Sequence, residues 1–134
     1  GRHNQFGTLD EILDLCRRVP GCAPCIDIAH LHARTAAWNT PAAFHALWDR
    51  VAAALGEAAL HDVHVHISGI AYDARNGERK HLPFDEADLD YRGFLAVMAE
   101  RGVRGLVIVE SPAREDDVLL LAEAWRSTIA ARAA

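Results

Sequence analysis

The sequence lacks the features that mark several common protein classes. No apolar run approaches the ~20 residues of a membrane span, and no signal peptide opens the chain, so we expect a cytoplasmic protein with no membrane partner. Its 14 Lys and Arg residues against 19 Asp and Glu give a formal net charge of -5. This leaves no bulk cationic surface of the kind that nucleic-acid-binding proteins use. Any anionic substrate would need local positive charge, for which bound metal cations are one source.

Cysteine is also scarce. The three cysteines are an odd number, which does not suggest a disulfide framework. Cys22 and Cys25 have the spacing of a redox or zinc-knuckle pair, but no second pair completes a four-ligand zinc site. We therefore expect ordinary loop or buried cysteines.

What the chain does contain is the composition and pattern of one globular α/β domain. It has 134 residues, of which 51% are hydrophobic and 25% are charged. Apolar stripes at helical spacing alternate with short apolar runs, which predicts a parallel sheet with right-handed crossovers. The predicted strands are 24–30, 62–68 and 105–110, the predicted helices are 8–19, 41–55, 88–101 and 115–132, and 69–88 is expected to be a long loop.

The strand predicted at 62–68 carries two histidines on one face. His64, His66 and Ser68 alternate with Val63, Val65 and Ile67, so the polar side chains point one way and the apolar ones the other. In an α/β protein such polar groups gather at the carboxyl end of the strands, where sites form. We expect His64, one pleat deeper than His66, to pack or to form hydrogen bonds inside the sheet.

Each predicted strand delivers one side chain that can bind a metal to the same edge of the sheet. These are Asp27, His66 and Glu110, with His30 just beyond the first strand and His81 in the loop after the second. Mixed carboxylate and imidazole ligands suit zinc, manganese or iron, and are typical of catalytic sites. The sequence therefore predicts a metal site, with a hydrogen-bonded histidine network as the alternative.

Four segments resemble successive motifs of the endonuclease IV type of xylose isomerase-like TIM barrel. They are Cys25-Ile-Asp-Ile-Ala-His30, His64-Val-His-Ile-Ser-Gly69, Gly77-Glu-Arg-Lys-His-Leu-Pro83 and Val109-Glu-Ser-Pro112. That family cleaves DNA 5′ to abasic sites with a three-zinc cluster. The resemblance implies that Asp27, His66 and Glu110 hold one zinc, that His30 and His81 hold a second, and that Glu110 is catalytic.

The chain departs from the family pattern in two ways. Arg79 stands where the family places an Asp two residues before the His81 equivalent, and Glu78 or a water could fill that position. The family's first two histidine ligands and its bridging glutamate lie on earlier strands that the chain does not contain. A closed (β/α)8 barrel takes ~250 residues, so residues 1–134 are expected to be one domain, the carboxyl-terminal part of a barrel.

Three functions follow from these observations as expectations. The leading one is a fragment of a zinc-dependent phosphodiesterase of base excision repair, acting on DNA with abasic sites and completed by a missing amino-terminal half-barrel; alone, the chain should be weak or inactive. The second is a sugar isomerase or epimerase of the same superfamily, acting on a small sugar. The third is a catalytically inactive half-barrel that associates with itself through its open strand edges.

Overall fold

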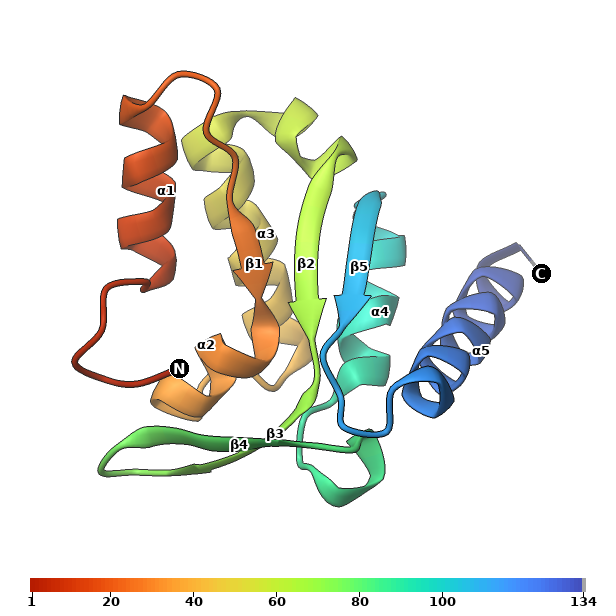
Figure 1. Ribbon diagram of the computed structural model, residues 1–134. Coiled ribbons are helices and arrows are strands. Elements are labelled where there is room, and N and C mark those ends of the chain that lie inside the picture. Colours follow the sequence, from red (N-terminus) through yellow and green to blue (C-terminus); the bar gives the residue numbers. More distant parts are fainter. Residues whose placement is uncertain (134) are drawn as a thin grey trace.

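The computed structural model describes residues 1–133 and shows a parallel sheet backed by helices, with a hairpin crossing its lower edge (Figure 1). No helix in this range is both long and apolar enough to cross a membrane. The elements in chain order are α1 (Leu9–Arg18), β1 (Cys25–Asp27), α2 (Ile28–Thr35), α3 (Pro41–Leu55), the 3-10 helix η1 (Glu57–His61), β2 (Val63–Ile67), β3 (Gly69–Asp73), β4 (Gly77–Leu82), the 3-10 helix η2 (Phe84–Glu86), α4 (Tyr91–Glu100), β5 (Gly105–Val109) and α5 (Glu115–Ala133).

The three parallel strands lie in the order β1-β2-β5, as the alternation of strands and helices predicted. Asp27 pairs with His66, and His66 pairs in turn with Ile108. Helix α3 connects β1 to β2 and helix α4 connects β2 to β5, which makes consecutive β/α units of one barrel wall. The predicted fold, a partial (β/α)8 barrel, is confirmed.

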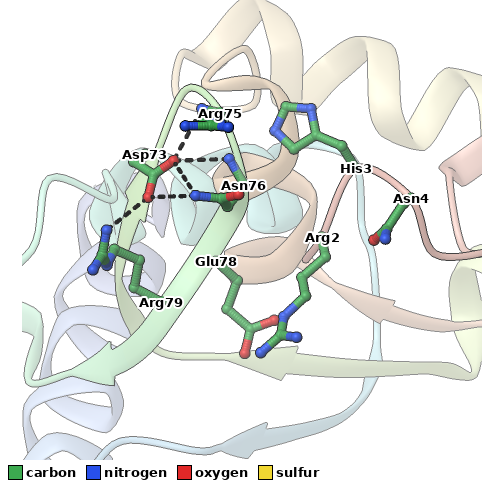
Figure 2. A pocket seen from close by; sticks show the side chains of 8 residues that line it. All are labelled: Arg2, His3, Asn4, Asp73, Arg75, Asn76, Glu78 and Arg79. Atoms are coloured by element: carbon green, nitrogen blue, oxygen red, sulfur yellow. Dashed lines mark hydrogen bonds and ion pairs between the residues drawn. The ribbon is translucent and has the colours of Figure 1, made fainter.

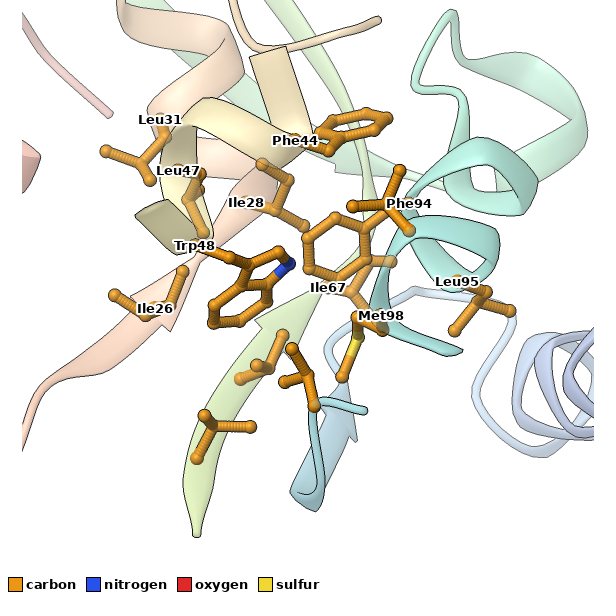
Figure 3. Close-up of a cluster of buried hydrophobic side chains, with 14 of the residues drawn as sticks. Ile26, Ile28, Leu31, Phe44, Leu47, Trp48, Ile67, Phe94, Leu95 and Met98 are labelled. Atoms are coloured by element: carbon orange, nitrogen blue, oxygen red, sulfur yellow. The ribbon is translucent and has the colours of Figure 1, made fainter. Parts of the chain in front are cut away.

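Helices α3 and α4 cover one face of this sheet and form the core with it (Figure 1). Val65 and Ile67 of β2 are fully buried against this layer. Phe94 packs edge-on against Phe44, with ring centroids 5.3 Å apart, and beside Trp48 (Figure 3). Each fully buried side chain of this size contributes about 1.5–3 kcal/mol, so this layer fixes the position of β2.

The opposite face of the sheet is open. Leu106 of β5 is 57% exposed and Ile108 is 38% exposed, although both are large and apolar. Both lie beside His64 and His66 on the same face, because paired residues of neighbouring parallel strands point the same way. No element within residues 1–133 covers this face, which is the one that points into the interior of a closed barrel.

Three sequence predictions about local structure are wrong. The strand predicted at 24–30 ends at Asp27, because that side chain accepts a hydrogen bond from the backbone N–H of His30 and caps helix α2. The predicted loop at 69–88 contains the antiparallel hairpin β3–β4. Helix α4 begins at Tyr91 rather than at 88, since Asp90 is its N-cap.

Helix α5 is present as predicted but buries less of itself than its apolar stripe suggests. Leu121 and Ala124 are buried, while Val118, Leu119 and Ile129 are 47%, 64% and 44% exposed. The helix packs beside α4 at one side of the layer, so only its near face has a neighbour among the described residues. Its other apolar residues therefore remain on the surface.

Candidate metal centre

The five residues predicted as ligands meet at the carboxyl ends of the parallel strands. Asp27 ends β1, His30 lies in the first turn of α2, His66 is in β2, His81 is in β4 and Glu110 follows β5. All five side chains are half-buried. They are held at this edge because three parallel strands end together there and because the hairpin β3–β4 crosses below them (Figure 1).

Asp27, His66 and Glu110 form the first group, which takes one residue from each strand end. One ligand atom from each lies within 4.8 Å of the others. His66 Nδ1 is 3.1 Å from Glu110 Oε1. Ligands 2.0–2.2 Å from a zinc ion lie up to about 4.4 Å apart, so a small movement of one side chain brings this group to coordination distance.

His30, His81 and Glu110 form a second group within the same 4.8 Å limit. The Nε2 atoms of His30 and His81 face each other at 3.2 Å. Glu110 belongs to both groups, so its carboxylate lies between two sets of nitrogen and oxygen donors. One carboxylate with two oxygens can serve two neighbouring cations.

A backbone contact sets the tautomer of His81. Its Nδ1 lies 2.8 Å from the backbone oxygen of Glu110, which can only accept a hydrogen bond, so Nδ1 carries a proton and donates it. In the neutral ring this leaves Nε2 with a free lone pair aimed at His30. Such a backbone partner is typical of histidines that bind metals, because it fixes the tautomer and the ring orientation.

Asp27 orients His30 from the other side. One carboxylate oxygen accepts the backbone N–H of His30 and the second contacts His30 Nδ1. The hydrogen bond that the Asp27 carboxylate accepts from the His30 ring raises the pKa of His30, although partial burial opposes this rise. When both rings are neutral, two Nε2 lone pairs face each other, and they repel unless a proton or a metal cation lies between them. The contact therefore fits a hydrogen bond between the two rings, which the raised pKa of His30 favours, and it also fits a metal cation held between them.

Arg79 does not take the place of the carboxylate that the family pattern expects. Its guanidinium binds Asp73 at 2.9 Å and is exposed. Glu78 points to the site instead: its Oε2 is 3.5 Å from His30 Nε2. Glu78 can therefore supply the oxygen ligand beside His30 that the family pattern expects from an Asp at the position of Arg79.

A polar pocket lies between the hairpin and the amino-terminal segment, and Glu78, which contacts His30, is one of the residues that line it. Figure 2 shows Arg2, Arg75 and Arg79 around it, with Asp73 at the turn of the hairpin. Hydrogen bonds from the backbone N–H of Asn76 and from Arg79 lower the pKa of Asp73 to about 2. The pocket has more cationic than anionic side chains, so it provides the local positive charge that the whole chain lacks.

Sequence reasoning did not include Cys25 and His64 in the site. His64 is exposed rather than packed inside the sheet, and its Nε2 lies 3.1 Å from His66 Nε2. Cys25 is exposed and lies opposite His64 on the neighbouring strand. The sequence pattern could have predicted both, because Cys25 lies two residues before Asp27 on one strand and His64 lies two residues before His66 on the next, so each pair shares a face of the sheet.

The fold and this edge define an α/β protein of the partial-barrel class, with imidazole and carboxylate groups at the carboxyl ends of its strands. The chain belongs to the xylose isomerase-like TIM barrel family, whose sequence profile matches residues 1–131. It is 39% identical over 126 residues to an uncharacterized protein of Methanocaldococcus jannaschii. That alignment covers 93% of the chain and 45% of the relative, so the chain spans less than half of that protein. No solved structure matches the chain.

Proposed function

We propose that the chain is the carboxyl-terminal part of a metal-dependent phosphodiesterase of the endonuclease IV type, which cleaves DNA at abasic sites in base excision repair. The observation that carries this proposal is the sharing of Glu110 between two groups of potential metal ligands. Pairs of neighbouring cations are a recurring arrangement in nucleases and phosphatases. Zinc fits the imidazole and carboxylate donors, and manganese or iron would fit them also.

A cation held by these residues would polarise a phosphate oxygen and lower the pKa of a bound water. The chain's own side chains prepare the site for it. Asp27 and Glu110 supply negative charge, and Glu110 contacts both groups, which makes it the residue that we propose to be catalytic. His81 keeps Nε2 free because its Nδ1 donates to the backbone oxygen of Glu110.

The arginines of the pocket support an anionic substrate. Arg2 and Arg75 line it together with Glu78, whose carboxylate also contacts His30 of the second group. DNA phosphates bound at this pocket would therefore lie beside the proposed centre. Phosphate contacts of this kind position a duplex without reading its sequence, which suits an enzyme that recognises a missing base.

The open face of the sheet supports a partner that completes the barrel. Leu106 and Ile108 are exposed on that face, and a full-length relative is more than twice as long as the part that matches this chain. We propose that an amino-terminal half-barrel covers them. Self-association of two copies is the alternative, and a stable monomer in sedimentation would exclude it.

One observation favours a different substrate class. The net charge of -5 suits a small neutral molecule such as a sugar better than DNA, and isomerases and epimerases of the same superfamily would use similar strand-end ligands. The two functions differ in the use of the arginine pocket, because a neutral sugar gains little from the guanidinium groups of Arg2 and Arg75, which line the pocket beside the ion pair of Arg79 with Asp73.

The experiment compares both activities on the chain and on its complete gene product. We expect metal-dependent cleavage of duplex DNA at an abasic site by the gene product, weak cleavage by the chain, and none by Glu110→Gln in either. The chain should also bind abasic duplex more tightly than intact duplex in a fluorescence anisotropy titration with Mn²⁺. Ketose epimerisation without DNA cleavage, or cleavage that survives Glu110→Gln, would overturn the proposal.

A further inference from the structure

A thiol and a second imidazole lie one residue pair deeper in the sheet than the proposed centre. In the pairing of β1 with β2, Cys25 is opposite His64, and Asp27 is opposite His66. Because side chains two residues apart on a strand share a face, all four side chains point to the open side of the sheet. The face therefore carries two successive levels of metal-binding groups.

The deeper level has its own convergent geometry. One ligand atom each of Cys25, His64 and His66 lies within 4.8 Å of the others, and the two Nε2 atoms are 3.1 Å apart. In a zinc site the nitrogen ligands lie about 2.0 Å from the metal ion and a sulfur ligand lies about 2.3 Å from it. The two nitrogens already have the separation of neighbouring ligands of a tetrahedral cation, and a small movement of the Cys25 side chain would supply a third ligand and leave the fourth position open.

The chemistry of the donors differs from that of the proposed centre. Thiolate with imidazole selects soft or borderline cations such as Zn²⁺ and Cd²⁺, whereas Mn²⁺ prefers carboxylate and water. Cys25 and His64 are both exposed within residues 1–133, so a cation can reach them from the open face of this chain. The thiol loses its proton to the solvent as the sulfur–metal bond forms, with no change in oxidation state.

His66 is common to both levels and faces each with a different ring nitrogen. Its Nδ1 is 3.1 Å from Glu110, and its Nε2 is 3.1 Å from His64. A neutral imidazole has one nitrogen with a lone pair, while the other carries a proton. Binding a cation through Nε2 therefore places the proton on Nδ1, where it can donate to Glu110 but cannot bind a second cation.

We infer that Cys25, His64 and His66 form a second metal site, for a thiophilic divalent cation, and that this site competes with the proposed centre for His66. The competition rests on the proposed function, whereas the site itself does not. A thiophilic cation at the deeper level would act as an inhibitor, because it removes one ligand from the group that contains Asp27 and Glu110.

The site is tested by titrating the chain with Cd²⁺ and following the ultraviolet thiolate-to-cadmium charge-transfer band. All variants are made in a Cys22→Ser chain, in which Cys25 is the one exposed cysteine within residues 1–133. The Cys22→Ser chain without further changes is the control. We expect the band in this background, its loss on adding Cys25→Ser, and an affinity lower by more than about tenfold on adding His64→Asn or His64→Gln. A band that survives Cys25→Ser, or is unaffected by both His64 variants, would overturn the site.

The competition is tested by loading the chain with Mn²⁺ and following its release by electron paramagnetic resonance as Cd²⁺ is added. We expect release at a Cd²⁺ concentration more than about tenfold lower in the Cys22→Ser background than with Cys25→Ser added. Equal release concentrations would refute the competition. Failure of the proposed function gives a different result: Mn²⁺ then does not bind, while the cadmium band is unchanged.

Discussion

The shared position of Glu110 predicts that one substitution weakens both groups of ligands at once. Glu110→Gln replaces a carboxylate by an amide of the same shape and removes one donor from each group, whereas His81→Asn changes the second group only. A cation that binds only the folded chain stabilises it by about 2.7 kcal/mol at a free concentration 100 times its Kd. Two occupied groups then contribute about 5 kcal/mol in the unsubstituted chain.

These values give different melting shifts for the variants. Replacing a group that supports a metal ligand already lowers affinity by up to about 100-fold. If loss of the ligand itself costs the same factor, about 0.4 kcal/mol remains from each affected group at the same Mn²⁺ concentration. At about 4 °C per kcal/mol, we expect Mn²⁺ to raise the melting temperature by about 20 °C in the unsubstituted chain, about 12 °C in His81→Asn and about 3 °C in Glu110→Gln.

The assay is thermal unfolding followed by circular dichroism, with and without Mn²⁺, so that each variant is its own reference. Glu86→Gln is the matched control, because Glu86 is exposed and belongs to neither group. It should keep the full shift. The reasoning is refuted if Glu110→Gln keeps the shift of the unsubstituted chain, or if it loses no more than His81→Asn does.

Three further predictions concern the parts of the fold that hold the site in place. Tyr72→Phe removes the hydrogen bond to Asp88, 2.7 Å long, and should cost about 1 kcal/mol in urea unfolding. That hydrogen bond raises the pKa of Tyr72 to about 12. Its contribution to the free energy of unfolding is therefore complete below about pH 10 and is lost as the pH rises through 12. The Tyr72→Phe variant should not show this loss of stability. Phe94→Ala empties a fully buried position and should cost about 3–5 kcal/mol in the same assay, and a cost below 1 kcal/mol would contradict the packing described. Gly105→Ala should cost about 2–3 kcal/mol, because the backbone there has φ of 149° and a Cβ would collide with the Val63 carbonyl oxygen; unchanged unfolding would contradict this.

The long helices and the apolar strands could be predicted because their signals are local. Thr40 and Pro41 begin helix α3 and Gly56 ends it, which the sequence pattern gives without knowledge of the fold. The alternation in β2 separates Val65 from His66 in the same way. Such signals depend on neighbours in the chain, so they can be found without knowledge of the tertiary contacts.

Helix α2 was missed because its first residues imitate a strand. Ile26, Asp27 and Ile28 alternate apolar with polar, and two histidines and an arginine interrupt the apolar stripe that would reveal the helix. The informative signal was Asp27, which can cap the amino-terminal end of a helix. Its carboxylate accepts a hydrogen bond from the backbone N–H of His30, three residues later. That cap places His30 in the first turn of a helix rather than at the end of a strand.

The hairpin was missed because β4 has almost no apolar alternation. Glu78, Arg79 and Lys80 follow one another, and the strand is held by pairing with β3 rather than by burial. Asn76-Gly77 was a turn signal of the kind found in hairpins. The convergence of Asp27, His66 and Glu110 followed from the rule for strand ends. His81 was assigned as a ligand by the family resemblance alone, because its position against Glu110 depends on this hairpin.

The hairpin β3–β4 is fixed at the end that carries His81 and exposed at the other end. At its base, Gly69 has no room for a side chain, since a Cβ there would lie 2.6 Å from the Leu82 carbonyl oxygen, and His81 is fastened to Glu110. The turn at residues 74–76 lies at the far end of the two strands and is exposed. Changes in this turn should therefore alter the lining of the polar pocket, which includes Arg75 and Asn76, and leave the groups at the strand ends in place.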